Sequence, residues 1–270
     1  MTDAEPTKGR LAAILPMLQS GQVATTVGLA FNGAAAYVYL AAAGRSLGPT
    51  AFAPVSALWT VVFLVGTGLF QPFDQELGRS IAARRALGLG TSSVVRRIAA
   101  VAAGVFAVAA VAAVIASGPI AEHLFRGDRG FVPVLIVGVG GVGFMFVVRG
   151  LLAGSGRYFG YAVLFLADGL TKSIPALAYW FAGGKSAIVF GAIVVLAAFI
   201  GGAVPLTRGT RTTEGGAAPA WSTISAAIGF LMVTSVLSQL LLNVGTLAVE
   251  VLAKSGESDR AGVVLSVLAI

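Results

Sequence analysis

The chain contains no cysteine, a single histidine and few charged residues of either sign. Without cysteine there is no disulfide, no thiolate nucleophile and no cysteine-ligated metal or iron–sulfur cluster. His123 has no second histidine with which to form a metal site, so we expect neither a metal nor a cofactor. Acidic and basic side chains do not gather at one place along the sequence, which argues against an enzyme such as a membrane-embedded transferase.

Charged residues make up 11% of the chain, whereas a soluble domain carries about a quarter. Hydrophobic residues make up 57%, and the mean hydropathy is +0.92. Apolar runs of the roughly 20 residues that cross about 30 Å of hydrocarbon recur along the chain, and they are too long for barrel strands. The sequence therefore predicts an all-α, polytopic transmembrane bundle. The net charge of +7 lies largely in loops beside these runs, so we expect membrane lipids as partners and no nucleic acid.

The complete spans are predicted at residues 20–42, 51–73, 98–118, 131–148, 159–181, 186–206 and 224–249. An eighth run begins near Ala261 and stops at Ile270, after about 15 Å of helix, so we expect a chain that is cut short. The predicted domains are a cytoplasmic tail (1–19), a six-helix bundle (20–206), a cytoplasmic linker (207–221) and the start of a second bundle (222–270).

Arginine and lysine are more frequent in the segments that lie inside if the N-terminus is cytoplasmic. Most of this excess comes from residues 74–97, which we expect to form a long basic loop. The first span is longer than the apolar part of a signal peptide, so we interpret it as uncleaved. The prediction is a multi-pass protein of a bacterial cytoplasmic membrane with its N-terminus inside.

A faint internal repeat relates Asn32–Leu58 to Asn243–Leu268, with one residue fewer in the second copy. Each copy leads from an apolar helix through a short loop into another apolar helix. A repeat that restarts after six helices would be parallel, as in transporters built from duplicated bundles.

Asp168 and Lys172 are the most distinctive polar residues, because both lie inside the predicted span 159–181. Their i to i+4 spacing puts them on one face of a helix, where they can pair. Charges at this depth are costly and normally mark a substrate or ion path, although they also serve as structural ion pairs between helices. Pro175 lies one turn further on and predicts a kink or break there.

The predicted span 224–249 carries a polar stripe that includes Gln239 and Asn243. Such a stripe faces other helices or a cavity rather than lipid, and interhelical hydrogen bonding is the alternative to a cavity lining. Asn32 and Gln71 add polar side chains in the first two spans. Together these residues suggest a central cavity with a polar lining.

Gly138, Gly140 and Gly143 have the spacing of a dinucleotide-binding fingerprint. They lie in an apolar segment of membrane length, without the soluble βαβ unit that the fingerprint needs. Close packing of helices is the better interpretation of these glycines.

Three segments resemble loops of the polysaccharide flippases, which belong to the multidrug/oligosaccharidyl-lipid/polysaccharide exporter superfamily. The segments are residues 43–53 (AGRSLGPTAFA), 78–82 (GRSIA) and 149–157 (RGLLAGSGR). This resemblance implies two six-helix bundles around a central cavity and alternating access that carries a lipid-linked sugar outward. Because the chain holds one bundle and the start of another, the resemblance also implies a second chain that completes the transporter.

The resulting hypothesis is a flippase-like exporter of a lipid-linked oligosaccharide or polysaccharide precursor, without enzymatic activity. The candidate cavity residues are Asp168, Lys172, Gln239, Asn243, Asn32 and Gln71, and the candidate headgroup contacts are Arg79 and Arg149. One alternative is a multidrug or small-cation antiporter of the same superfamily, with Asp168 as the coupling carboxylate. A further alternative is a membrane fragment or scaffold that does not transport.

Overall fold

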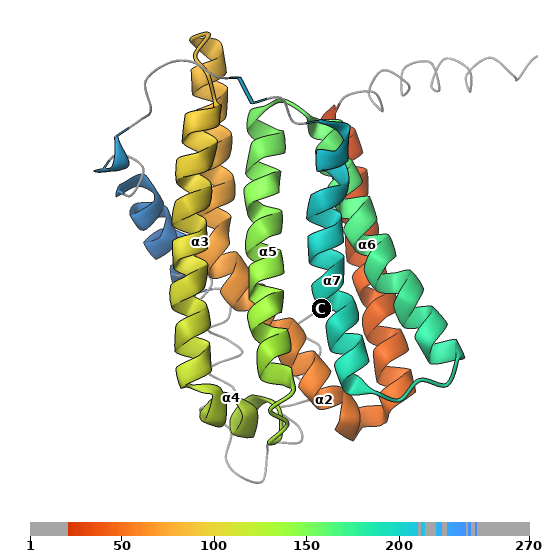
Figure 1. The fold of residues 1–270 in the computed structure, drawn as a ribbon. Coiled ribbons are helices and arrows are strands. Elements are labelled where there is room, and N and C mark those ends of the chain that lie inside the picture. Colours follow the sequence, from red (N-terminus) through yellow and green to blue (C-terminus); the bar gives the residue numbers. More distant parts are fainter. Residues whose placement is uncertain are drawn as a thin grey trace, which may run out of the picture.

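The computed structural model describes residues 21–209, 212–213, 220–222, 226–235, 237–238 and 241. Within these residues every regular element is helical (Figure 1). Five of the helices are long and apolar enough to cross a membrane. The expected all-α membrane bundle is therefore present, while residues 1–20 and half of the predicted span 224–249 lie outside the described part.

The first long element, α2 (Gly21–Ala86), is two helical arms that meet at a kink. Gly48 forms the kink with φ 73° and ψ 170°, a backbone conformation that is essentially restricted to glycine. The first arm covers residues 21–47 and the second covers residues 49–86. In Figure 1 the two arms run in opposite directions, and the kink lies at the bottom of the view.

The expected long loop over residues 74–97 is wrong. The second arm of α2 continues to Ala86, and α3 begins at Ser92, so only a short turn connects them. Hydropathy marks where the chain leaves the hydrocarbon, but a helix continues into water when its residues favour it. Ala, Leu, Arg and Glu, which are good helix formers, supply much of residues 74–86.

Residues near the kink are held by the turn that follows α6. Ser46 donates its hydroxyl hydrogen to the carbonyl oxygen of Gly184. Lys185 Nζ donates to the carbonyl oxygen of Ser46 at 2.7 Å. These bonds connect parts of the chain that are far apart in sequence and stabilise the hairpin formed by the arms of α2. We call this end of the bundle the Gly48 end and the opposite end the Ser155 end.

The elements that follow α2 are four long helices that run between these two ends and two short elements that lie at the ends. They are α3 (Ser92–Ile115), α4 (Ser117–Leu124), α5 (Phe131–Gly154), α6 (Tyr158–Phe181), α7 (Ala187–Ala203) and the 3₁₀ segment η1 (Val204–Arg208). The short helix α4 lies in what the sequence predicts as a loop. The helix α6 passes Pro175 without interruption, so the predicted break is absent.

Glycines allow α5 to lie directly against its neighbours. A Cβ atom on Gly143 would lie 2.9 Å from the ring of Phe70, and one on Gly138 would lie 2.9 Å from Val62. A Cβ on Gly154 would lie 2.7 Å from the carbonyl oxygen of Gly78. The interpretation of Gly138 and Gly143 as packing residues is confirmed. In lipid, where apolar contact alone brings little gain, such close approach is a main source of helix association.

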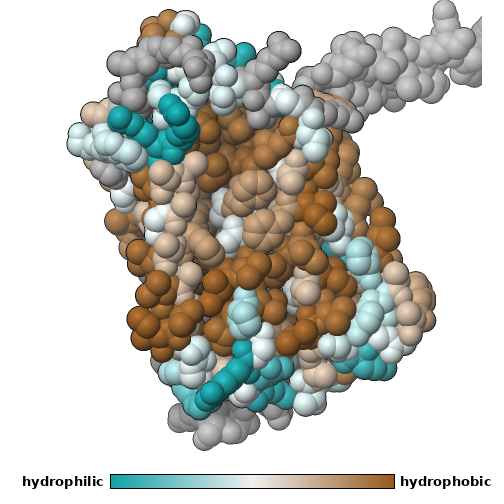
Figure 2. All heavy atoms as spheres, viewed as in Figure 1, coloured by the Kyte–Doolittle hydropathy of each residue, from teal (hydrophilic) through white to brown (hydrophobic). Residues whose placement is uncertain are grey.

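The surface of the bundle has an apolar middle and polar ends. Figure 2 shows hydrophobic residues over the central part of the viewed face and hydrophilic residues gathered toward the top left and the bottom. Many large apolar side chains on the flanks are exposed, among them Val108, Val111, Leu166, Ile174 and Leu196. This distribution fits a helical protein that is embedded in a membrane.

A short apolar helix over Ala226–Ser235 coincides with the beginning of the predicted span 224–249. Ile228 is buried against the main core, and Met232 packs against the same core. Residues 242–270, which include the second copy of the internal repeat, lie outside the described residues.

Candidate functional site

Asp168 and Lys172 form an ion pair within α6, as their spacing predicts. Lys172 Nζ lies 2.6 Å from Asp168 Oδ2, and the side chains are 2% and 5% exposed for Lys172 and Asp168 respectively. The pair lies near the middle of α6, about 15 Å along the helix axis from its first residue. An ion pair so deeply buried in an apolar bundle is costly to form, and the two groups satisfy each other only if they stay together.

Helices on both sides of α6 enclose this pair. The ammonium group of Lys172 lies 5.6 Å from the centre of the Trp59 ring on the second arm of α2, within the range of a cation–π interaction. Trp59 stacks on Tyr39, whose hydroxyl donates to the carbonyl oxygen of Phe190 on α7 at 2.8 Å. On the α7 side, a Cβ atom on Gly201 would lie 2.6 Å from Asp168 Cβ. The pair therefore lies where α2, α6 and α7 pack together.

A second polar group joins three helices near the Ser155 end. Arg149 on α5 lies 3.2 Å from Asp74 on α2, and its Nε donates to the hydroxyl of Tyr161 on α6 at 2.8 Å. The guanidinium also lies over the rings of Phe146, Tyr161 and Phe165. We call Asp74, Arg149 and Tyr161 the Arg149 cluster. Its arrangement fixes the separation of the three helices at this level.

The other candidate headgroup contact, Arg79, is paired within its own helix. Its Nε and Nη2 donate to the carboxylate of Glu76 at 2.9 and 2.8 Å. Ser80 donates to the same carboxylate at 2.8 Å. The Glu76 side chain is 3% exposed, whereas that of Arg79 is 64% exposed. Arg79 thus neutralises a buried acid with one edge of its guanidinium and leaves the rest at the surface.

The remaining predicted cavity residues are not gathered around Asp168. Asn32 is half-buried on the first arm of α2, and its Oδ1 is buried without a hydrogen-bond partner. Its neighbour Phe31 packs against Gly169 on α6. Gln71 is half-buried on the second arm. Gln239 and Asn243 lie outside the described residues.

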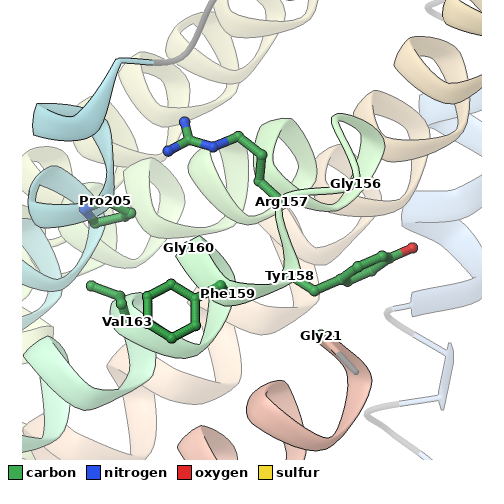
Figure 3. A pocket seen from close by; sticks show the side chains of 8 residues that line it. All are labelled: Gly21, Gly156, Arg157, Tyr158, Phe159, Gly160, Val163 and Pro205. Carbon is green, nitrogen blue, oxygen red and sulfur yellow. The ribbon is translucent and has the colours of Figure 1, made fainter. Parts of the chain in front are cut away.

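One pocket opens at the Ser155 end, between the start of α2, the start of α6 and η1 (Figure 3). Its volume is about 350 Å³, and Gly21, Arg157, Phe159 and Pro205 are among its lining residues. Figure 3 shows Phe159 and Val163 on one side of Tyr158, whose ring points the other way. Arg157 donates to the carbonyl oxygen of Gly209 at 2.8 Å, so part of its charge is already compensated.

Two apolar cavities lie along α3. The first, of about 340 Å³, is lined from α2, α3, α5 and α7, and the second, of about 380 Å³, is lined from α2, α3, α4 and α5. Phe106 lines both of them. Neither Asp168 nor Lys172 lines these two cavities or the pocket beside Arg157.

The candidate residues predicted from the sequence include Arg149 and Arg79 but not their acidic partners, Asp74 and Glu76. A usable signal exists in the sequence, because both acids directly follow a long apolar run, where an unpaired carboxylate is costly.

Among the described residues, no group of three or more histidine, aspartate or glutamate side chains could hold a metal ion.

Comparisons with protein-family models, with curated proteins and with solved structures found no match to this chain. A proposal for the function of this chain therefore rests on the described geometry and on the physical chemistry of the residues.

Proposed function

We propose that this chain is a membrane transporter that exports a lipid-linked oligosaccharide or polysaccharide precursor by alternating access. The buried ion pair of Asp168 and Lys172 is the observation that carries the proposal. Intramembrane charges are expensive and usually belong to a substrate or ion path. In the described arrangement the pair is enclosed, so substrate would reach it in a second conformation, in which α6 separates from α2 or α7.

The proposed topology has six spans in the described bundle. At 1.5 Å per residue, the first arm of α2 is about 40 Å long and the second about 57 Å, so each arm is long enough to cross about 30 Å of hydrocarbon. Together with α3, α5, α6 and α7 they give six crossings. Basic residues near the Ser155 end include Arg84, Arg85, Arg96 and Arg97, which supports the proposal that this end faces the cytoplasm of a bacterium.

The distribution of polar groups suits an amphipathic substrate. The Ser155 end carries exposed arginine, which attracts the phosphate of a lipid headgroup at the cytoplasmic face. In this proposal Arg79 makes first contact with the exposed edge of its guanidinium. Arg149 acts mainly by holding α2, α5 and α6 together, since its guanidinium already pairs with Asp74 and donates to Tyr161.

The test is transport in vesicles that contain the purified protein and a fluorescent farnesyl diphosphate-linked N-acetylglucosamine. Dithionite quenches the label only in the outer leaflet, so protein-dependent loss of the protected signal reports flipping. We expect the Asp168→Asn, Lys172→Gln double variant to insert normally and to lose flipping. The matched control is Glu122→Gln, Arg129→Gln, which removes one acid and one base from exposed positions. Wild-type flipping by the ion-pair variant would contradict the proposed substrate path.

A drug or small-cation antiporter is the second candidate, and the burial of Asp168 favours it. A carboxylate at mid-membrane can bind a proton or a cation once Lys172 moves away. Efflux of a cationic dye that depends on a proton or sodium gradient, without flipping of the lipid-linked sugar, would identify this function. Absence of both activities would favour a scaffold, or a fragment that needs a second chain.

A further inference from the structure

The first arm of α2 packs closely against α6. A Cβ atom on Gly28 would lie 2.9 Å from the carbonyl oxygen of Ala162, and one on Gly169 would lie 3.1 Å from Ala35 Cβ. These contacts lie at two levels of α6, one near the Ser155 end and one near the middle of the helix. Close approach of this kind holds helices together in lipid, so the first arm and α6 form one packed unit, which we call the α6 pair.

The second arm of α2 packs in the same way against α5. Besides the contacts of Gly138, Gly143 and Gly154, a Cβ atom on Gly66 would lie 2.6 Å from Val142. We call this unit the α5 pair. Helix α7 also lies against it, because a Cβ atom on Gly202 would lie 2.7 Å from the ring of Phe144 on α5.

The two pairs are connected through the kink at Gly48. Before the kink, Ser46 is bound to the turn that follows α6. After the kink, the carbonyl oxygen of Thr50 accepts a hydrogen bond of 3.3 Å from Arg126, which lies in the turn before α5. That carbonyl has no helical donor, since the residue four positions on is Pro54. Each side of the kink is therefore fastened to its own pair, and the backbone between them passes through one glycine.

Contacts between the pairs differ at the two ends of the bundle. Toward the Gly48 end, Tyr39 on the first arm is fully buried and stacks on Trp59 on the second arm. Toward the Ser155 end, Arg149 of the α5 pair, 22% exposed, donates to Tyr161 of the α6 pair. Beside it lies a small apolar cluster, separate from the main core, of Met145, Val148, Leu152, Leu164 and Phe165. The Ser155 side is thus closed by a contact that reaches the surface.

The buried ion pair lies at this boundary. A Cβ atom on Gly201 of α7 would lie 2.6 Å from Asp168 Cβ, so α7 covers the carboxylate. Phe165, whose ring lies 5.5 Å from the Arg149 guanidinium, is one helical turn before Asp168 toward the Ser155 end. Separation of α6 from α5 and α7 at that end would uncover Asp168.

We propose that the α6 pair rocks away from the α5 pair and α7 at the Ser155 end, with Gly48 as the hinge and the Arg149–Tyr161 hydrogen bond as the latch. Hinge motions of this kind place the change of backbone angles in a few residues. The inference rests on the proposed function, since it assigns the side from which substrate reaches the ion pair. Arg149 stays on Asp74 during opening, because both belong to the α5 pair. Its freed Nε–H then faces the opening, where it can donate to an anionic headgroup.

The first experiment measures opening without transport. Leu164→Cys places a single thiol in the small apolar cluster between the pairs, where the native side chain is fully buried. In nanodiscs, the rate of its reaction with a water-soluble maleimide reports how often the cluster opens. Tyr161→Phe removes the latch, and we expect this rate to rise about fivefold, the change in equilibrium that one hydrogen bond supplies.

Two controls separate this opening from general loosening. Leu77→Cys places a thiol at a fully buried position inside the α5 pair, next to Gly150, and its rate should stay the same when Tyr161→Phe is added. Tyr158→Phe makes the same change as Tyr161→Phe at an exposed position of α6, and it should leave the rate at Leu164→Cys unchanged. An equal rise at both thiols would overturn the rocking motion.

The second experiment locks the boundary with a disulfide. A Cβ atom on Gly160 of the α6 pair would lie 3.1 Å from Leu152 Cδ2 of the α5 pair, so Leu152→Cys, Gly160→Cys joins the two pairs. Gly78→Cys, Ala153→Cys is the matched control within the α5 pair, with a Cβ separation of 3.9 Å that suits a disulfide. Flipping is followed by extraction of the fluorescent probe with albumin, because dithionite would reduce the disulfide. We expect the first disulfide to stop flipping until it is reduced with dithiothreitol, and the second to have no effect.

The outcomes distinguish the motion from the function. Wild-type flipping with residues 152 and 160 cross-linked would overturn the rocking motion and leave the proposed function. Loss of flipping with either disulfide would place the motion within the α5 pair and would overturn the assignment of the latch. Latch-dependent opening at Leu164→Cys, without flipping by the wild-type chain, would overturn the proposed function and leave the rocking motion.

Discussion

Arg149 on α5 contacts Asp74 on α2 at 3.2 Å, at the level where the backbones of the two helices touch. The carbonyl oxygen of Asp74 lies so close to Gly150 that a Cβ atom there would be 2.7 Å away. The ion pair and the close approach therefore depend on each other. A larger residue at 150 would push Asp74 away from Arg149.

Bulk at the crossing of α2 and α5 is expected to destabilise the bundle. Gly154→Val places a side chain against Gly78 and Ile81, and overpacking of this kind costs about 1–3 kcal/mol. Gly33→Ala is the control, because nothing lies within 4 Å of its Cβ position. Thermal unfolding in detergent should show a lower midpoint for Gly154→Val only. Equal midpoints in the two variants would contradict the role of Gly154 in packing.

Removal of one partner of the buried ion pair should cost more than removal of both. Lys172→Met leaves the Asp168 carboxylate buried without a counter-charge and should lower stability by about 3–5 kcal/mol. The Asp168→Asn, Lys172→Met double variant should recover most of this loss, because no isolated charge remains. Thermal unfolding of the four members of this mutant cycle gives the coupling. A double variant that is stable and still transports would show that transport does not need the pair.

Gly48 should be intolerant of any side chain. An alanine in its conformation, with φ 73° and ψ 170°, stores about 1–3 kcal/mol of backbone strain. Gly44→Ala, four residues earlier, has free space at Cβ and ordinary helical geometry, and it should be neutral or slightly stabilising. The yield of folded protein after size-exclusion chromatography compares the two. Normal yield of Gly48→Ala would mean that the kink relaxes without cost.

Within the Arg149 cluster, the charged partner should matter more than the hydroxyl. Tyr161→Phe removes one hydrogen bond and keeps the ring under the guanidinium, so a loss of about 1 kcal/mol is expected. Arg149→Met leaves Asp74, which is 12% exposed, without its partner and should cost about 1.5–3 kcal/mol. Thermal unfolding of both variants tests this order, and the reverse order would contradict it.

The absence of cysteine allows a direct test of topology. Thr50→Cys and Leu87→Cys place single thiols at exposed positions at opposite ends of the second arm of α2. In intact spheroplasts, a membrane-impermeant maleimide should label residue 50, and residue 87 should react only after permeabilisation. Labelling of both from outside would contradict the crossing of this arm, and the reverse pattern would contradict a cytoplasmic N-terminus.

The sequence predicted some helices almost to the residue and misplaced the ends of others. The span 159–181 coincides with α6 because Gly156 and Gly183 flank it with turns. The predicted ends at residues 73 and 148 are too early, since α2 and α5 continue to Ala86 and Gly154. The length of an apolar run reflects the thickness of the hydrocarbon. The backbone hydrogen bonds of the helix continue beyond the hydrocarbon for as long as the residues tolerate a helix.

Some contacts of the candidate residues could be predicted from the sequence and others could not. The pairing of Asp168 with Lys172 was predictable, because one turn of a helix joins them. The pairing of Arg149 with Asp74 was not, because it depends on how α5 crosses α2 and no local spacing encodes it. The two apolar cavities along α3 were also not predictable from the sequence, because an alanine-rich helix shows the same pattern whether or not it packs closely against its neighbours.

The length of the second arm of α2 has a mechanical consequence. One of its closest backbone approaches to α5, at Gly78, lies far from the middle of the arm, with nearly four times as many residues toward Gly48 as toward Ala86. If the arm tilts as a rigid rod about Gly78, its Gly48 end travels nearly four times as far as its Ala86 end, since helical rise is uniform. A small displacement on one side of the membrane is thereby amplified on the other.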